Sequence, residues 1–534
     1  MSKLFERLIR ARGVTSEFLR PKYDDLEEPY LLPDMELAVE RICKAVERRE
    51  KVLIYGDYDV DGITASVVME ETLRLIGVEN IEVMLPDRFA DGYGMSPKVI
   101  TRALKQGVEL VITVDCGSAN KNIVQKLKEE KVDVIITDHH ECPRDLPEAV
   151  AVVNPKRREY QGFREIAGVG VAFQVARGLV ERGLLPKGQE KWLLDLVLMG
   201  TICDNMPLNR DNRIFGVFGL KVLEKTRRVG LLELARIAKV KTWDAEAIGF
   251  QIGPRLNAAG RLESAELSLE LLRTQSQAEA VRLAVKLEEL NQKRRVEQKM
   301  AVSEIKNRSK EDNPVIIETG RWHEGILGIV AGRLVEMYKK PAFVLSEVAE
   351  GVFKGSGRSF GDFSLIEAID CCRDILISGG GHKGACGVRI AKDKIAEFKE
   401  RVNSFYKSLK LDSQEGFLNR QVDIEVENLA DFSLEFLDEM RQLQPFGEGN
   451  EEPVFKLVKV EVAEMRWMGT EQQHLMLRVV GRDGSMMKLV AFFAKDKWRV
   501  MENTQVDVLV QVMKNEWNGL SSVEGRILEI YNMV

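Results

Sequence analysis

The sequence has few cysteines and no long apolar run, and each shortage narrows the class of protein. Seven cysteines lie among 534 residues without a Cys-x-x-Cys pair. This pattern argues against a disulfide framework and favours reduced thiols in the cytoplasm. No apolar run approaches the ~18 residues of a membrane span, and the N-terminus lacks the apolar core of a signal peptide. We therefore expect a cytoplasmic protein with no membrane partner.

A strong charge of one sign is also missing. Lys and Arg total 78 against 84 for Asp and Glu, which gives a net charge of −6. A nucleic-acid partner would therefore have to be bound by local basic patches, because the chain has no global positive field. Charged residues make up 30% and hydrophobic residues 45%, which is ordinary for a globular protein with about three or four domains.

Histidine is scarce, with five in the chain, yet two of them are adjacent. His139 and His140 follow Asp138 directly. Imidazole is a common metal ligand and the usual proton carrier near neutral pH. A pair of histidines at one point of such a sequence therefore favours a functional role.

From Lys51 the pattern alternates between short apolar runs and helix-like segments. This alternation predicts a parallel sheet with crossover helices. In such sheets, ligands bind beyond the carboxyl ends of the strands. The predicted strands are Val52–Tyr55, Ile81–Leu85, Leu110–Val114, Val132–Thr137 and Val150–Val153.

Acids and histidines follow three of these strands and one apolar helical run. Each of them alone would be a helix cap or turn residue more often than a ligand, but their joint placement is harder to dismiss. Carboxylates that converge repel one another without a cation, and oxygen ligands with imidazole suit Mn²⁺ or Mg²⁺ better than Zn²⁺. The residues are Asp57, Asp59, Asp61, Asp115, Asp138, His139, His140 and Asp204.

The first of these stretches, Lys51 to Thr64, has two other interpretations when taken alone. It could be a solvated acidic turn or a calcium loop. An EF-hand is excluded, because no Glu stands at the twelfth loop position and a buried strand precedes the loop.

Four motifs resemble those of the DHH phosphoesterase superfamily. They are Gly56-Asp-Tyr-Asp-Val-Asp-Gly62, Val114-Asp-Cys-Gly117, Thr137-Asp-His-His140 and Gly200-Thr-Ile-Cys-Asp204. Three downstream motifs make the chain similar to the RecJ family of bacterial single-strand-specific exonucleases, and the last two resemble a DHHA1-type substrate domain. These are Gly253-Pro-Arg-Leu-Asn-Ala-Ala-Gly-Arg261, Gly355-Ser-Gly-Arg-Ser359 and Gly379-Gly-Gly-His-Lys383.

The resemblance and the pattern together predict an α/β chain of several parts. A DHH parallel-sheet domain is joined by a long helix, Ser276 to Arg308, to a DHHA1-type α/β domain. Recurrent short strands near the C-terminus predict a small β-barrel, for which the resemblance implies an OB-type fold. The expected parts are a helical lead-in at 1–50, the DHH metal domain at 51–265, the connecting helix at 266–310, the DHHA1 domain at 311–408 and the barrel at 415–534.

The motifs assign roles at a centre of two divalent cations, Mn²⁺ or Mg²⁺. We expect Asp115 to bridge the cations, His140 to be a ligand or a phosphate contact and proton donor, and Asp138 to orient an imidazole. Asp57 is expected to be a weaker or indirect ligand. Tyr55 stands where related enzymes often have His, which would weaken one metal position. The direct ligands are predicted to be Asp59, Asp61, Asp115, His139 and Asp204.

Substrate phosphates need cations and backbone N–H groups. Arg88 follows the second strand and so faces the same edge of the sheet. Gly380 and Gly381 beside His382 offer N–H groups that can approach a phosphate. The resemblance implies phosphate contacts for Arg255, Arg261, Ser356 and Arg358. In the barrel, exposed aromatics could stack bases, although each is more often a core residue: Trp467, Phe492, Trp498 and Trp517.

The resemblance implies a metal-dependent, single-stranded-DNA-specific 5′–3′ exonuclease in recombination and repair. It also implies a single-strand-binding protein as a partner, which no sequence feature shows. Two alternatives remain open. One is a DHH enzyme acting on short oligonucleotides or cyclic dinucleotides, and the other is a non-catalytic DHH-fold scaffold of a replication assembly.

Overall fold

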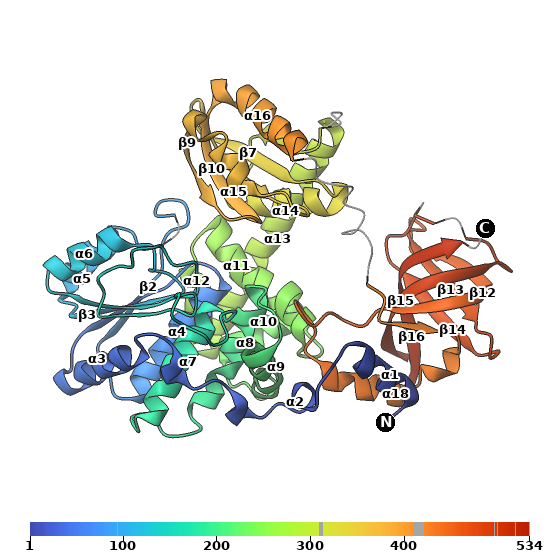
Figure 1. The fold of residues 1–534 in the computed structure, drawn as a ribbon, viewed down its shortest axis with the longest axis horizontal. Helices are drawn as coiled ribbons and strands as arrows, with labels where there is room; N and C mark the ends of the chain where they lie inside the picture. Colours follow the sequence, from blue (N-terminus) through green and yellow to red (C-terminus); the bar gives the residue numbers. More distant parts are fainter. Residues whose placement is uncertain are drawn as a thin grey trace. The chain divides into compact units, whose positions relative to one another are not determined.

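The structure is a computed structural model that describes residues 1–532 except 93, 309–312, 410–420, 496, 499 and 518, with only the backbone of 517 and 532. The chain forms two compact units (Figure 1). The first, which we call the barrel unit, consists of Met1–Glu28, Asn205–Glu224 and Asn419–Val534. The second, the metal unit, consists of Pro29–Asp204 and Lys225–Leu418.

A parallel sheet of five strands lies at the start of the metal unit, as predicted. The strand order is β2-β1-β3-β4-β5. Because the chain runs from β1 outward to β2 and then returns to β3, the order reverses between β1 and β3, and a crevice opens there at the carboxyl ends. The strands are β1 (Val52–Tyr55), β2 (Ile81–Met84), β3 (Leu110–Val114), β4 (Asp133–Thr137) and β5 (Ala151–Val153).

Helices cover both faces of this sheet, so its strands are continuous apolar runs (Figure 1). On one face, α4 packs against β1, β2 and β3 and against its neighbour α7. On the other face, two helices form an apolar core with the strands. The first face carries α3 (Met35–Arg48), α4 (Val60–Leu75) and α7 (Gly168–Glu181), and the second carries α5 (Lys98–Gln106) and α6 (Lys121–Glu129).

A helical segment follows the sheet and leads to the long helix that the sequence predicts. That helix, α13 (Gln277–Arg308), is continuous over 32 residues. It packs first against α10, α11 and α12 and later against α14 (Leu327–Tyr338). The segment before it contains α8 (Leu194–Cys203), α10 (Val229–Ala238), the π-helix η4 (Ala247–Ile252), α11 (Gly253–Leu262) and α12 (Glu266–Arg273).

The rest of the metal unit is a mixed sheet with helices, which confirms the predicted second α/β domain. Its strand order is β6-β7-β8-β10-β9, with β6 and β7 parallel and the other pairs antiparallel. Strand β9 lies at an edge. The strands are β6 (Ile316–Gly320), β7 (Ala342–Ala349), β8 (Val352–Arg358), β9 (Leu376–Gly381) and β10 (Ala385–Ala391), accompanied by α15 (Leu365–Asp370) and α16 (Ile395–Ser408).

The barrel unit contains the predicted C-terminal barrel. Strands β12, β13, β14, β16 and β15 pair in that order, and pairing of β12 with β15 closes the barrel. Strand β11 pairs in parallel with the first residues of β12. The strands are β11 (Ile424–Val426), β12 (Phe455–Met468), β13 (His474–Val480), β14 (Met486–Ala491), β15 (Gln505–Trp517) and β16 (Leu520–Asn532).

The helical lead-in expected at 1–50 is divided between the two units. Helix α1 (Lys3–Ala11) buries Leu4, Phe5 and Leu8 in the core of the barrel unit, whereas α3 packs in the metal unit. Helix α9 (Arg210–Leu223) also belongs to the barrel unit.

Of the aromatics considered for base stacking, Trp467 and Trp498 are partly buried against the barrel core. Phe492 is 61% exposed. The side chain of Trp517 lies outside the described residues. Among the described residues, no helix has both the length and the apolar character needed to cross a membrane.

Candidate metal centre

The loop after β1 places three acids at the crevice of the parallel sheet. Asp59 caps α4, because its Oδ1 accepts a 3.1 Å hydrogen bond from the N–H of Gly62. Asp61 lies in the first turn of the same helix. A Cβ at position 62 would lie 2.6 Å from the backbone of Asp57, so only glycine lets the loop close this tightly. Asp57 and Asp61 are buried and Asp59 is half-buried.

Asp115 directly follows β3 in a left-handed backbone conformation with φ of 60°. This conformation is uncommon for residues other than glycine and often marks a functional position. The N–H of Asp115 donates to the carbonyl of Thr137 at 2.9 Å, which ties the turn to the end of β4. The Asp115 side chain is 2% exposed and lies beside the loop after β1.

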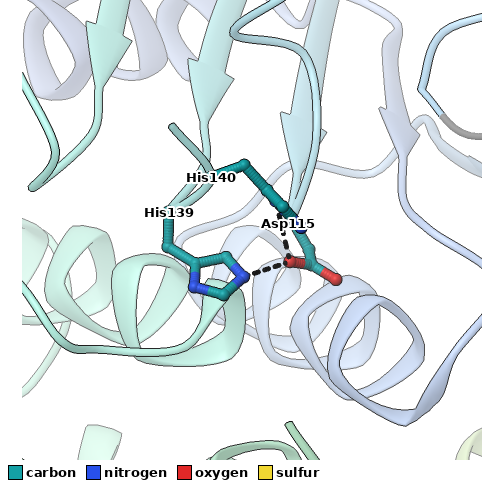
Figure 2. A group of neighbouring side chains, drawn as sticks. All are labelled: Asp115, His139 and His140. Atoms are coloured by element: carbon teal, nitrogen blue, oxygen red, sulfur yellow. Dashed lines mark ion pairs between the residues drawn. The ribbon is translucent and has the colours of Figure 1, made fainter. Parts of the chain in front are cut away.

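Asp138 organises the two histidines after β4. Its Oδ1 accepts hydrogen bonds from the N–H groups of His139 and His140 at 2.8 and 3.1 Å, and lies 2.9 Å from Nδ1 of the His140 ring. Its Oδ2 accepts the N–H of Ser118 at 2.9 Å. Asp138 thus contacts the backbone of both histidines and the ring of His140, while the His139 ring is directed toward Asp115 (Figure 2).

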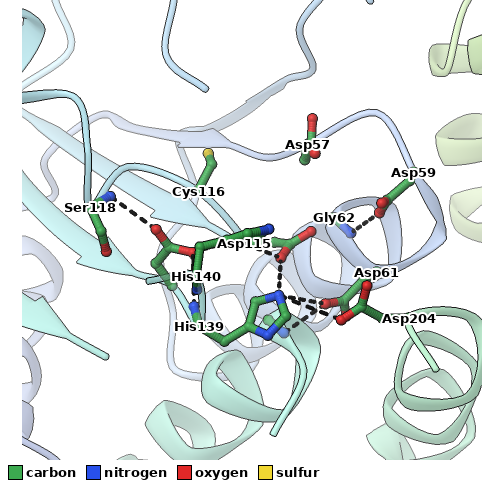
Figure 3. A network of polar contacts seen from close by, with 12 residues as sticks. Asp57, Asp59, Asp61, Gly62, Asp115, Cys116, Ser118, His139, His140 and Asp204 are labelled. Carbon is green, nitrogen blue, oxygen red and sulfur yellow. Dashed lines mark hydrogen bonds and ion pairs between the residues drawn. The ribbon is translucent and has the colours of Figure 1, made fainter. Parts of the chain in front are cut away.

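Three of the predicted ligands, Asp61, Asp115 and Asp204, converge on the His139 ring, whereas Asp57 and Asp59 lie apart from it (Figure 3). Its Nε2 lies 3.0 Å from Asp115 Oδ1, 3.6 Å from Asp204 Oδ2 and 3.7 Å from Asp61 Oδ2. Asp204 follows α8, so a helix end and three strand ends meet here. Three sets of ligand atoms each lie within 4.8 Å of one another: Asp115, His139 and His140; Asp61, His139 and Asp204; and Asp57, Asp59 and Asp115.

Burial and mutual repulsion disturb the acids of this cluster. Burial raises the pKa of Asp115, and the nearby charges of Asp61 and Asp59 raise it further. The pKa values of Asp57, Asp61 and Asp204 are raised for the same two reasons, burial first. Acids packed in this way are poorly stable as anions unless a cation lies among them.

The two histidines have opposite protonation tendencies. Burial, aided by the charge of His140, lowers the pKa of His139 to about 3, so its ring is neutral and its Nε2 can act as a ligand. Burial also opposes the charged form of His140, but the hydrogen bond and charge of Asp138 outweigh it and raise the pKa of His140 to about 9. The His140 side chain is 42% exposed, so a cationic imidazole reaches the solvent side of the centre.

The donor set fits divalent cations. Asp115 Oδ1, His139 Nε2 and Asp204 Oδ2 are buried and have no hydrogen-bond partner among the described residues. Unpartnered buried polar atoms are costly, and here all three are ligand-type atoms pointing at one another. Carboxylate oxygens with one or two imidazoles match the preference of Mn²⁺ and Mg²⁺.

Two glycines that the sequence did not single out for this purpose shape the centre. The N–H groups of Gly168 and Val169, at the start of α7, donate to Asp61 at 2.6 and 2.9 Å. A Cβ at Gly168 would lie 2.5 Å from Asp115 Oδ1, and one at Gly200 would lie 2.6 Å from Asp61 Oδ1. The Gly-Val-Gly start of an apolar helix was the only sequence signal for the role of Gly168.

Arginines gather next to this centre. Burial lowers the pKa of Arg261 to about 9, and the neighbouring charges of Arg88, Arg294 and Arg358 lower it further. Arg294, on α13, is half-buried, and its Nε has no hydrogen-bond partner among the described residues. Such a group of cations would favour a polyanionic ligand.

The other residues predicted to contact phosphates differ from one another in their partners and in their exposure. Arg255 is buried and pairs with Glu288 of α13 at 2.6 Å, while it donates to the carbonyl of Gln251. Ser356 lies next to Arg358 on β8 and accepts from it at 3.3 Å. Gly380 and Gly381 are exposed on the edge strand β9, with His382 directly after it.

Comparison with known proteins shows which families the parts of this chain resemble. The DHH family N-terminal domain matches residues 51–201, the DHHA1 domain matches 312–408 and the RecJ OB domain matches 422–529. A single-stranded-DNA-specific exonuclease RecJ from Haemophilus influenzae is 32% identical over 516 residues, which cover 92% of this chain and 89% of that protein. The chain belongs to the RecJ family.

Comparison with two further RecJ proteins supports the same family assignment. The Bacillus subtilis RecJ is 34% identical over 94% of this chain, although the match covers only 64% of that protein's own length. The crystal structure of Thermus thermophilus RecJ in complex with Mn²⁺ superimposes with a TM-score of 0.83 at 28% identity, covering 99% of this chain and 76% of that chain. That of the same protein with Mg²⁺ gives a TM-score of 0.81 at 27% identity, covering 100% of this chain and 75% of that chain.

The tyrosine at position 55 has a structural explanation in this RecJ-family chain. Its hydroxyl donates to the carbonyl of Gly94 at 3.1 Å and accepts from the N–H of Ser96 at 3.2 Å. Its ring belongs to the apolar core under α5 and α6. The Tyr55 hydroxyl is thus engaged with the backbone of Gly94 and Ser96.

Proposed function

We propose that this chain is a metal-dependent, single-stranded-DNA-specific exonuclease that releases nucleotides in the 5′ to 3′ direction. The observation that carries the proposal is the convergence of Asp61, Asp115, His139 and Asp204, with unpartnered ligand atoms, at the reversal of strand order. Relatives over nearly the whole chain are named single-stranded-DNA-specific exonucleases. The OB-type barrel further supports a long single strand as substrate, because such barrels commonly bind single strands.

The residues of this chain would divide the work of phosphodiester hydrolysis. Two bound divalent cations would activate a water and neutralise charge on the scissile phosphate. Asp59, Asp61, Asp115, His139 and Asp204 would hold them, with Asp115 between the two positions and Asp57 contributing more weakly. The neutral His139 ring offers a lone pair, which a protonated imidazole could not.

His140 is placed for the leaving group or a phosphate oxygen. Its Nδ1 lies 2.9 Å from Asp138 Oδ1, its side chain is 42% exposed, and the raised pKa keeps the ring cationic near neutral pH. A cationic imidazole can hold a non-bridging oxygen or donate its proton to the departing oxygen. Asp138 supports this by fixing the orientation of the ring and stabilising its cationic form.

Phosphates beyond the scissile bond would be held by Arg88, Arg261, Ser356 and Arg358. Arg255 would bind a phosphate only after leaving its ion pair with Glu288. The exposed backbone of Gly380 and Gly381, with His382, would add N–H contacts. The cellular role that goes with this activity is recombination and repair in the cytoplasm. A single-strand-binding protein as partner is supported by the family resemblance alone.

The activity is tested with single strands labelled at the 5′ or the 3′ end and incubated with Mn²⁺. We expect the 5′ label to be released first, no cleavage after chelation, and no cleavage by Asp115→Asn. Asp393→Asn, an exposed acid in the second α/β domain, is the matched control and should digest normally. Release from the 3′ end would overturn the polarity, and absence of Mn²⁺-dependent cleavage would favour the scaffold alternative. Faster hydrolysis of dinucleotides than of long strands would favour the oligonucleotide phosphodiesterase.

A further inference from the structure

Tyr58 lies in the first acid loop between the ligands Asp57 and Asp59, but its ring serves a different group. The guanidinium carbon of Arg88 lies 4.8 Å from the centre of the Tyr58 ring. This is the range in which a guanidinium is attracted to the face of an aromatic ring. The two residues come from loops after adjacent strands, β1 and β2.

Arg88 differs from the other predicted phosphate-binding arginines in how its guanidinium is held. Arg255 pairs with Glu288, and Arg358 donates to the carbonyl of its neighbour Gly357 at 2.8 Å. Arg261 reaches the carbonyl of Gly325 at 3.4 Å. For Arg88, no hydrogen bond or ion pair of the side chain exists within the described part of the chain, so the Tyr58 ring is what positions it.

The backbone of Tyr58 is itself fixed. Its N–H donates to Asp57 Oδ1 at 2.8 Å, and a Cβ at Gly260 would lie 2.8 Å from its carbonyl oxygen. Gly260 directly precedes Arg261 on α11, so this close approach brings the acid loop and a second arginine together. One tyrosine thus connects the metal-ligand loop, Arg88 and the helix that carries Arg261.

We propose that Tyr58 is a positioning residue for the substrate: its ring holds the Arg88 guanidinium in place for a phosphate of the DNA strand. The inference rests on the proposed exonuclease function, with Arg88 as a phosphate contact. A ring that orients a cation reduces the entropy lost when the cation binds a phosphate. The hydroxyl of Tyr58 is not needed for this, since no hydrogen bond to it is seen among the described residues. A phenylalanine at position 58 should therefore position Arg88 as well as the tyrosine does.

The test compares Tyr58→Phe with Tyr58→Leu. Tyr58→Phe should behave as the wild type. Tyr58→Leu should raise KM for a single strand about tenfold with kcat changed less than about threefold, because a cation–ring contact of this kind is worth roughly that factor. The Kd for a labelled single strand in the presence of a chelator should rise by the same factor. Mn²⁺ affinity, measured by calorimetry, should not change, which separates positioning from damage to the acid loop.

A double-mutant cycle with Arg88→Ala decides whether Tyr58 acts through Arg88. If it does, Tyr58→Leu should weaken binding of the single strand when Arg88 is present but add almost nothing when Arg88 is already alanine. Additive effects, or a Tyr58→Phe variant as weak as Tyr58→Leu, would overturn the inference. The exonuclease proposal has a separate failure: a wild-type protein that does not digest single strands at all. Thermal unfolding of each variant shows whether it is folded, and a Tyr58→Leu variant that binds Mn²⁺ normally yet keeps full DNA affinity also refutes the inference.

Discussion

The N–H of Gly168 donates a 2.6 Å hydrogen bond to Oδ2 of Asp61, and there is no room for a side chain at Gly168 beside Asp115. The start of α7 thus positions two of the proposed ligands: Asp61 through its backbone and Asp115 through the absence of a Cβ. Positive charge at a helix N-terminus also favours the Asp61 carboxylate.

Gly168→Ala should therefore disrupt the metal centre more than the fold. The new methyl group would displace the Asp115 carboxylate, so Mn²⁺ affinity measured by calorimetry should fall by about tenfold or more. Gly332→Ala is the matched control, because Gly332 also lies in a helix, α14, and a Cβ there would have no heavy atom within 4 Å. The control should keep full affinity and be slightly more stable. Unchanged Mn²⁺ binding by Gly168→Ala would contradict the close contact.

Without metal, the protein should lose stability as pH rises from about 6 to 9. The raised pKa values of Asp61, Asp115 and Asp204 mean that these groups bind protons more tightly folded than unfolded, and His140, with a pKa of about 9, behaves likewise. Folding then takes up protons, and stability present at low pH is lost as pH passes through the folded pKa values, at roughly 1.4 kcal/mol per pH unit for each proton.

Thermal unfolding in chelator and in saturating Mn²⁺, followed across this pH range, measures the effect. We expect Tm in chelator to fall with pH, and Mn²⁺ to raise Tm most at the alkaline end. Asp115→Asn should flatten the dependence, whereas Asp393→Asn should leave it as in the wild type. A Tm in chelator that is constant or rises over this range would argue against crowded acids.

The roles of the two adjacent histidines should separate. His139→Ala removes a ligand atom and should weaken Mn²⁺ binding by about tenfold or more. His140→Ala should lower kcat by about 10²–10⁴-fold with a much smaller effect on Mn²⁺ affinity, since its Nδ1 is engaged with Asp138. Calorimetry and steady-state kinetics on both variants make the comparison. Equal losses of Mn²⁺ affinity would make His140 a ligand instead.

Asp138→Asn should move the pH profile of kcat. The carboxylate of Asp138 raises the pKa of His140, so its removal lowers that pKa and shifts the alkaline limb to lower pH. The shift should be absent when His140 is already alanine. An unchanged alkaline limb would show that the protonated imidazole is not required.

Arg213 should be a main determinant of the stability of the barrel unit. It is 2% exposed, and its guanidinium donates to the carbonyls of Phe18, Gln442, Leu443 and Gln444. Arg213→Ala leaves buried acceptors without a donor and should cost about 2–4 kcal/mol in urea unfolding. Arg441→Ala, at a surface pair with Asp438, should cost less than about 1 kcal/mol. A small loss for Arg213→Ala would mean that water replaces these contacts.

Much of the fold could be predicted because its strongest signals are local. Strands buried on both faces are continuous apolar runs, so β1 and β3 matched the predicted residues. The acids at strand ends were recognisable because the sheet is parallel and brings those ends together. The length of α13 followed from a long stretch without Gly or Pro.

What could not be predicted depends on contacts between distant parts of the chain. The Gly-Val-Gly start of α7 does not identify Asp115, more than 50 residues earlier in the chain, as the side chain for which Gly168 makes room. Arg294 stands in a Lys-Arg-Arg run of the sequence, which does not indicate that the residue is half-buried or that its charge acts on Arg261. The partners of Arg213 lie more than 190 residues away in both directions along the chain.

The division of the chain has a consequence for how such a protein can be cut or recombined. The first segment of the metal unit ends at Asp204, the very next residue begins a segment of the barrel unit, and the metal unit resumes at Lys225. Removing everything after the second α/β domain would deprive the apolar face of α1 of its core, and Arg213 of α9 of the carbonyls of residues 442–444. Exchange of the barrel between genes by one crossover would have the same defect, so the two halves of this protein are expected to be inherited together.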